Sequence, residues 1–101
     1  MEQLERIREN EARLDRLNAA CAALSNALEA YAAAQGDARA LSEYYGSADW
    51  RRDFGDDEKG LLPASLKRGV LSEDGAYDAL ADNRALLAEM LEICARILKG
   101  E

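Results

Sequence analysis

The sequence predicts an all-α protein, with two long antiparallel helices, short helices between them, and a helical bundle completed by dimerisation. Three observations lead to this prediction. The 101-residue chain has 49% hydrophobic residues and a single proline, a composition typical of a folded chain rather than a disordered one. Apolar residues recur at spacings of three and four near both ends of the chain. Glycines recur through the middle of the chain, which favours short helices there.

The first long helix is predicted over residues 2–35. This stretch has no Gly or Pro, is rich in Ala, and pairs Glu2 with Arg6 four residues later, which stabilises an exposed helix face. Its larger apolar residues are spaced by three, four or their sum; they are Leu4, Ile7, Leu14, Leu17, Cys21, Leu24, Leu28 and Tyr31. Gly36 is expected to end this helix and Asp37 to cap the next.

Short helices are predicted over residues 38–45, 48–54 and 63–68. Ser47 is the expected N-cap of the second, and Pro63 can occupy the first position of the third. Between these two, the segment GDDEKG at 55–60 has two glycines, four charges and no apolar residue, which is typical of an exposed loop.

The second long helix is predicted over residues 73–99. Ser72 is its expected cap, and Glu73 and Asp74 add negative charge at the positive end of the helix dipole. Just before it, Val70 and Leu71 are expected to be buried between helices. The apolar face of this helix is broad, which predicts packing against more than one neighbour.

The length of the first helix predicts a homodimer. A helix of about 34 residues spans roughly 50 Å, whereas a compact domain of about 100 residues has a diameter of roughly 33 Å. The rest of a single 101-residue domain cannot cover such a helix, and a second copy would cover what remains.

Charge and cysteine usage narrow the possible ligands. The net charge of −7 disfavours binding to nucleic acid or to an anionic membrane. The chain has no His, so a zinc site built from thiols and imidazoles is excluded, and no cofactor is predicted. Cys21 and Cys94 are expected to be reduced, buried and unbridged. The N-terminus is charged, and no stretch of about 18 residues is apolar and uncharged. These features predict a cytoplasmic protein that is not associated with a membrane.

The segment YYGSADWRRDF, residues 44–54, holds four of the six aromatic residues. In one interpretation, Tyr44, Trp50 and Phe54 fill the end of the bundle between short helices. In the other, a partner-binding patch is formed by Tyr45, Trp50, Arg51 and Arg52. Trp, Tyr and Arg are the residue types that dominate protein–protein hot spots.

The favoured function is a protein–protein interaction or adaptor module that self-associates, with no catalytic or metal residue assigned. One alternative is a metal-dependent hydrolase, because the pairs Asp78 with Asp82 and Glu89 with Glu92 can each share a helix face and bind Mg²⁺. Whether these carboxylates bind a metal is left open. Another alternative is an acidic inhibitor or nucleic-acid mimic.

Three stretches together carry a family resemblance: MEQLERIRENEARLD at the start, YYGSADWRRDF, and LPASLKRGVLSEDGAYDALADNRALLAEM. Nearly the whole chain, including the pattern YYGS, Trp50 and GVLSEDG, resembles a family of small bacterial proteins known as a domain of unknown function. The resemblance implies a bacterial, non-secreted, helical protein and assigns no catalytic residue.

Overall fold

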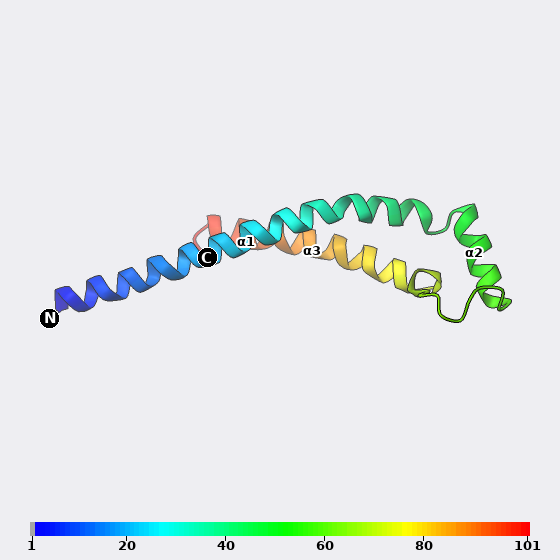
Figure 1. Ribbon diagram of the computed structural model, residues 1–101. Helices are drawn as coiled ribbons and strands as arrows, with labels where there is room; N and C mark the ends of the chain where they lie inside the picture. Colours follow the sequence, from blue (N-terminus) through cyan, green and yellow to red (C-terminus); the bar gives the residue numbers. More distant parts are fainter. Residues whose placement is uncertain (1) are drawn as a thin grey trace. The chain divides into compact units, whose positions relative to one another are not determined.

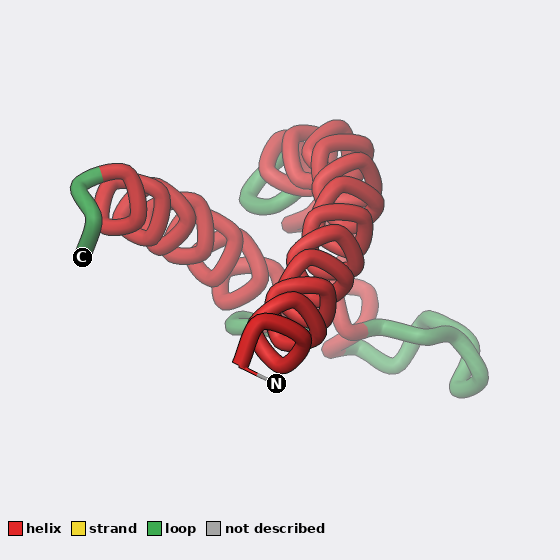
Figure 2. The backbone as a smooth tube through the Cα atoms, turned by 90° about the vertical axis from the view of Figure 1, so that its left-hand side faces the viewer, coloured by secondary structure: helices red, strands yellow, loops and turns green. Residues whose placement is uncertain are grey.

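The computed structural model describes residues 2–101, which form α-helices and one short 3₁₀ helix (Figure 1). The elements are α1 (Glu2–Tyr44), α2 (Ala48–Glu58), η1 (Gly69–Leu71) and α3 (Gly75–Leu98). Figure 2 shows helices joined by loops, with no strand in residues 2–101, so the all-α prediction is confirmed. The chain divides into two compact units, one ending at Asp37 and the other comprising Ala38–Glu101. The single domain, the antiparallel pairing and the dimer stay predictions.

Helix α1 is longer than predicted, at 43 residues or about 65 Å. The predicted end at Gly36 is wrong, because Gly36 lies inside the helix with Asp37 and the whole of 38–44. A glycine in a helix interior costs only about 1 kcal/mol relative to alanine, which its alanine-rich neighbours outweigh. The helix ends before Gly46, whose φ of 80° is the left-handed conformation that glycine favours.

Helix α2 begins as predicted and ends later. The Ser47 Oγ accepts a hydrogen bond from the Trp50 backbone N–H at 3.1 Å, so the N-cap prediction is confirmed. The predicted end at residue 54 and the predicted loop 55–60 are wrong, since the helix runs to Glu58. Gly60, with a φ of 73°, ends it, and the Leu61 N–H closes the last turn on the Asp56 carbonyl at 3.0 Å.

The predicted helix over 63–68 is absent; this segment forms turns and bends. One backbone hydrogen bond, from Leu66 N–H to the Pro63 carbonyl at 3.1 Å, closes a single turn. The Arg68 guanidinium donates to the same Pro63 carbonyl at 2.6 Å and to the Leu66 carbonyl at 3.3 Å. A side chain therefore satisfies carbonyls that a continuing helix would have satisfied.

Helix α3 begins at Gly75, two residues after the predicted start, and its N-cap residue is Asp74, so the prediction that Ser72 is the N-cap is wrong. The Ser72 Oγ accepts from the Gly75 N–H at 2.9 Å and donates to the Gly69 carbonyl at 2.8 Å. This hydroxyl links η1 to the first turn of α3, and it leaves no room for a side chain at residue 75. A Cβ on Gly75 would lie 2.4 Å from the Gly69 carbonyl oxygen and 2.5 Å from the Ser72 Oγ.

Burial within one chain is slight. Over residues 2–101 the buried hydrophobic side chains are Leu71 and Ala76, with 6% and 3% of their surface exposed. The prediction for Leu71 is confirmed, whereas Val70 is 43% exposed. Cys21 and Cys94 are free and exposed in the single chain, so their predicted burial is wrong there.

Candidate functional site

The aromatic corner, defined as Tyr44, Tyr45, Trp50 and Phe54, lies where α1 gives way to α2. Trp50 and Phe54 are four residues apart on one face of α2, and their rings stack with centroids 5.1 Å apart. The turn at Gly46 brings Tyr45 edge-on to Trp50, also at 5.1 Å. Both geometries are among those that aromatic pairs prefer.

The polar atoms of the corner bind the backbone that leads into α3. The Trp50 Nε1–H donates to the Val70 carbonyl at 2.8 Å, and the Tyr45 hydroxyl donates to the Glu73 carbonyl at 2.9 Å. Two rings predicted to bind a partner are thus half-buried and hydrogen-bonded within the unit Ala38–Glu101. They tie the end of α1 and the start of α2 to η1 and the start of α3.

The two arginines of the predicted patch are placed differently. Arg51 and Arg52 are both exposed on α2. The Arg52 Nη1 lies 3.9 Å from the Asp49 Oδ1, with side chains 73% and 80% exposed, and such a surface pair contributes little stability. The structure therefore gives the four predicted residues two roles: an internal pair of rings and an exposed pair of cations.

A second tyrosine links the helices on either side of the Gly46 turn. The Tyr44 hydroxyl donates to the Asp53 Oδ2 at 2.6 Å. This hydrogen bond, burial and the negative charges of Asp53 and Asp49 together raise the pKa of Tyr44 to about 12. The phenol is therefore neutral at physiological pH and serves as a hydrogen-bond donor.

Arg68 is a residue that sequence reasoning missed. It forms an ion pair with Asp57 of α2, and both side chains are largely shielded from solvent. The two residues are 11 apart across a loop, so no helical spacing indicates the contact. Their pairing holds the irregular segment 59–68 against α2.

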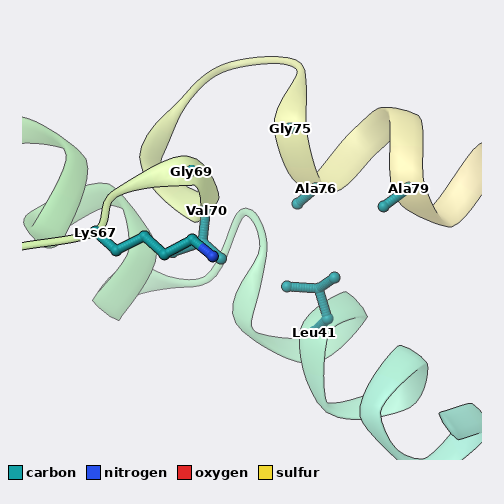
Figure 3. A pocket seen from close by; sticks show the side chains of 7 residues that line it. All are labelled: Leu41, Lys67, Gly69, Val70, Gly75, Ala76 and Ala79. Atoms are coloured by element: carbon teal, nitrogen blue, oxygen red, sulfur yellow. The ribbon is translucent and has the colours of Figure 1, made fainter.

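An apolar groove of about 510 Å³ lies beside the corner (Figure 3). It is lined by Leu41, Lys67, Gly69, Val70, Gly75, Ala76 and Ala79, and Lys67 is the only charged member of that lining. The missing side chains of Gly69 and Gly75 and the short ones of the two alanines leave it open. The sequence contains these small residues but does not show that Leu41 lies near them. The lining offers no acid–base pair and no metal ligands, so it suits an apolar group.

The carboxylates considered for a metal site, Asp78, Asp82, Glu89 and Glu92, are exposed on α3. In the part of the chain that the structure describes, no three His, Cys, Asp or Glu side chains gather closely enough to hold a metal ion. None of the helices in residues 2–101 combines the length and apolar character needed to cross a membrane.

The family described as a domain of unknown function (DUF4298) matches residues 7–93. The chain belongs to this family. The matched region contains the aromatic corner, the groove and most of both long helices. The resemblance read from the sequence is thereby confirmed. No curated protein matches the chain, and no solved structure does.

Proposed function

We propose that this DUF4298 protein is a protein–protein interaction module that self-associates, with its long helices antiparallel and a second copy completing the bundle. The observation that supports it is the exposure of large apolar residues at helical spacing. On α1 the exposed fractions run from 40% to 62%; the residues are Leu4, Ile7, Leu14, Leu17, Leu24 and Leu28. Helix α3 adds Leu91 at 73% and Leu98 at 87%.

Such a surface has a large free energy to gain from association. Fully burying a leucine side chain is worth about 1.5–3 kcal/mol, and contiguous apolar patches on a protein surface mark interaction sites. In a C₂ dimer each exposed stripe is covered by an equivalent stripe. Self-association therefore accounts for a chain that is half apolar yet buries few side chains alone.

The adaptor role is proposed for the exposed cations of α2. Arg51 and Arg52 follow Trp50 directly and place two adjacent positive charges on a chain whose net charge is −7. An acidic segment of another protein would complement them, and Arg is enriched where binding energy concentrates.

Light scattering tests the self-association. We expect a mass near twice 11.1 kDa at tens of micromolar, and a monomer mass for the double variant Leu17→Asp with Leu24→Asp, because both carboxylates would be buried in the contact. The matched control is Ala19→Asp, which adds a charge about 200° around α1 from Leu17. A monomer mass for the unmodified chain would overturn the proposal.

A further inference from the structure

The exposed stripe of α1 has a strict repeat between residues 7 and 28. Its members alternate at spacings of three and four; they are Ile7, Asn10, Leu14, Leu17, Cys21, Leu24 and Leu28. All seven are exposed, and Tyr31, the next along the stripe, is half-buried. A seven-residue repeat of this kind is the pattern by which two α-helices supercoil around each other.

We infer that this stripe pairs in parallel and in register with residues 7–28 of α1 in a second copy of the chain. The inference rests on the proposed self-association and specifies one contact within it. The stripe is narrow, with two positions per heptad, which suits one partner helix on this face; the antiparallel contact proposed between the two long helices would then use another face of α1. The charges beside the stripe and the single amide within it favour a second copy in parallel orientation.

Asn10 is the one amide in the stripe. In a parallel, in-register pair each layer contains the same residue from both copies, so the two Asn10 amides meet and can hydrogen-bond. An antiparallel pair that sets Leu14 opposite Leu24 places Asn10 opposite Leu28. That arrangement leaves the amide only the hydrogen bonds within its own helix, to the Arg6 carbonyl and from the Arg13 guanidinium. The parallel pair can add a hydrogen bond between the two amides and is therefore favoured. A polar residue in the seam of a coiled coil commonly fixes its register in this way.

Charge complementarity favours the same orientation. In a parallel coiled coil the residue before one layer contacts the residue five positions later on the partner helix. Arg6 precedes the Ile7 layer, and Glu11 follows Asn10, so Arg6 of each copy faces Glu11 of the other. In the antiparallel arrangement Glu11 faces the uncharged Ser25 instead. The parallel pair thus gains two ion pairs that the alternative lacks.

Cys21 provides the test, because it is an exposed member of the stripe. In the parallel pair the two Cys21 residues share one layer, where their Cα atoms can approach to the roughly 7 Å that a disulfide allows. In the antiparallel pair Cys21 faces Leu17, and the two thiols are offset by about 6 Å along the axis in addition to the separation of the helices. The experiment uses the full chain with Cys94→Ser, treated with diamide, which oxidises two thiols to one disulfide.

We expect a covalent dimer on a non-reducing gel that dithiothreitol reverses. A second single-cysteine chain, Leu14→Cys with Cys21→Ser and Cys94→Ser, should cross-link as well. The matched control places the cysteine on the outer face as Ala19→Cys in the same background. Both stripe cysteines should react at least about tenfold faster than this control, since their effective concentration in a dimer is in the millimolar range.

The outcomes separate the inference from the function on which it rests. A dimer mass by light scattering, with neither stripe cysteine cross-linking faster than the control, would overturn the parallel pairing and leave self-association standing. A monomer mass would overturn both. Rapid cross-linking of both stripe cysteines in a species of dimer mass is the result that supports the inference.

Discussion

The aromatic corner and residues 2–28 of α1 are both rich in apolar side chains, yet only the corner shields its large side chains partly from solvent within one chain. In the corner, two ring polar atoms reach backbone carbonyls, and the buried Leu71 and Ala76 lie in the adjoining η1 and α3. Along residues 2–28 of α1 every large aliphatic side chain is at least 40% exposed. Short helices joined by turns can surround a side chain, whereas a single uninterrupted helix cannot fold back to cover its own apolar side chains.

Because of this difference, substitutions that affect folding stability should be distinct from those that affect the proposed self-association. Each hydrogen bond from the rings of the corner to the backbone is worth about 1 kcal/mol, and stacking of the rings adds a similar amount. Changes there should lower the stability of the unit Ala38–Glu101 and leave the proposed dimer contact on α1 unaltered. Changes on the α1 stripe should weaken the proposed dimer and leave the stability of that unit unaltered.

Replacing Trp50 by Ala should have the largest effect on stability. It removes the stack on Phe54 and the hydrogen bond to the Val70 carbonyl, and we expect a loss of about 3 kcal/mol, at the lower end for tryptophan because the ring is half-buried. Trp50→Phe keeps a ring and loses the hydrogen bond, so it should cost about 1 kcal/mol. Urea unfolding followed by circular dichroism measures both.

The exposed arginines give the contrast to Trp50. The double substitution Arg51→Ala with Arg52→Ala should change the free energy of unfolding by no more than about 0.5 kcal/mol. If it destabilised the protein as Trp50→Ala does, the division of this segment into internal rings and exposed cations would be wrong. If it kept every partner recovered from a cell lysate, the adaptor proposal for these cations would fail.

The sequence predicted features set by local chemistry. Helical spacing indicated the all-α class, Ser47 was recognisable as an N-cap, and Leu71 was recognisable as buried. The errors in the helix ends concern glycines, since Gly36 and Gly55 lie inside helices whereas Gly46 and Gly60 end them. The two glycines that end helices adopt a positive φ, and the two inside helices do not. Which conformation each glycine adopts depends on tertiary contacts of the segment after it. The Arg68 ion pair and the groove were likewise not predictable, because they form only when segments distant in the sequence meet.

Replacing two of the glycines by alanine should change the stability in opposite directions, because their surroundings differ. Gly75→Ala should destabilise by about 2 kcal/mol, because its Cβ would lie 2.4 Å from a backbone oxygen that cannot move without displacing η1. Gly36→Ala should stabilise by up to about 1 kcal/mol, because the added Cβ would meet no atom within 4 Å beyond its chain neighbours and the backbone of its own helix, and alanine favours the helix. Thermal unfolding of the two variants compares them directly. Equal shifts in one direction would contradict the tight linkage of η1 to α3.

The effect of Tyr44→Phe should depend on pH. The hydrogen bond to Asp53 raises the pKa of Tyr44 to about 12, against about 10 in an unfolded chain. The folded state therefore favours the neutral phenol. Its contribution is fully present below about pH 10 and is lost as the pH rises toward 12. We expect Tyr44→Phe to cost about 1 kcal/mol at about pH 8, a value reduced for partial exposure to solvent.

The measurement is the difference in free energy of unfolding between the unmodified chain and Tyr44→Phe, at about pH 8 and again at about pH 11.5. Taking the difference cancels the titration of the other tyrosines and the lysines, which both chains share. The gap should shrink at the higher pH, because the unmodified chain loses the favoured neutral phenol and the variant has none to lose. Asp53→Asn is the control: without the carboxylate, the pKa of Tyr44 should move back toward 10, which the ultraviolet absorbance of tyrosinate follows. A gap that stays constant with pH would show that Tyr44 stabilises the turn by packing alone.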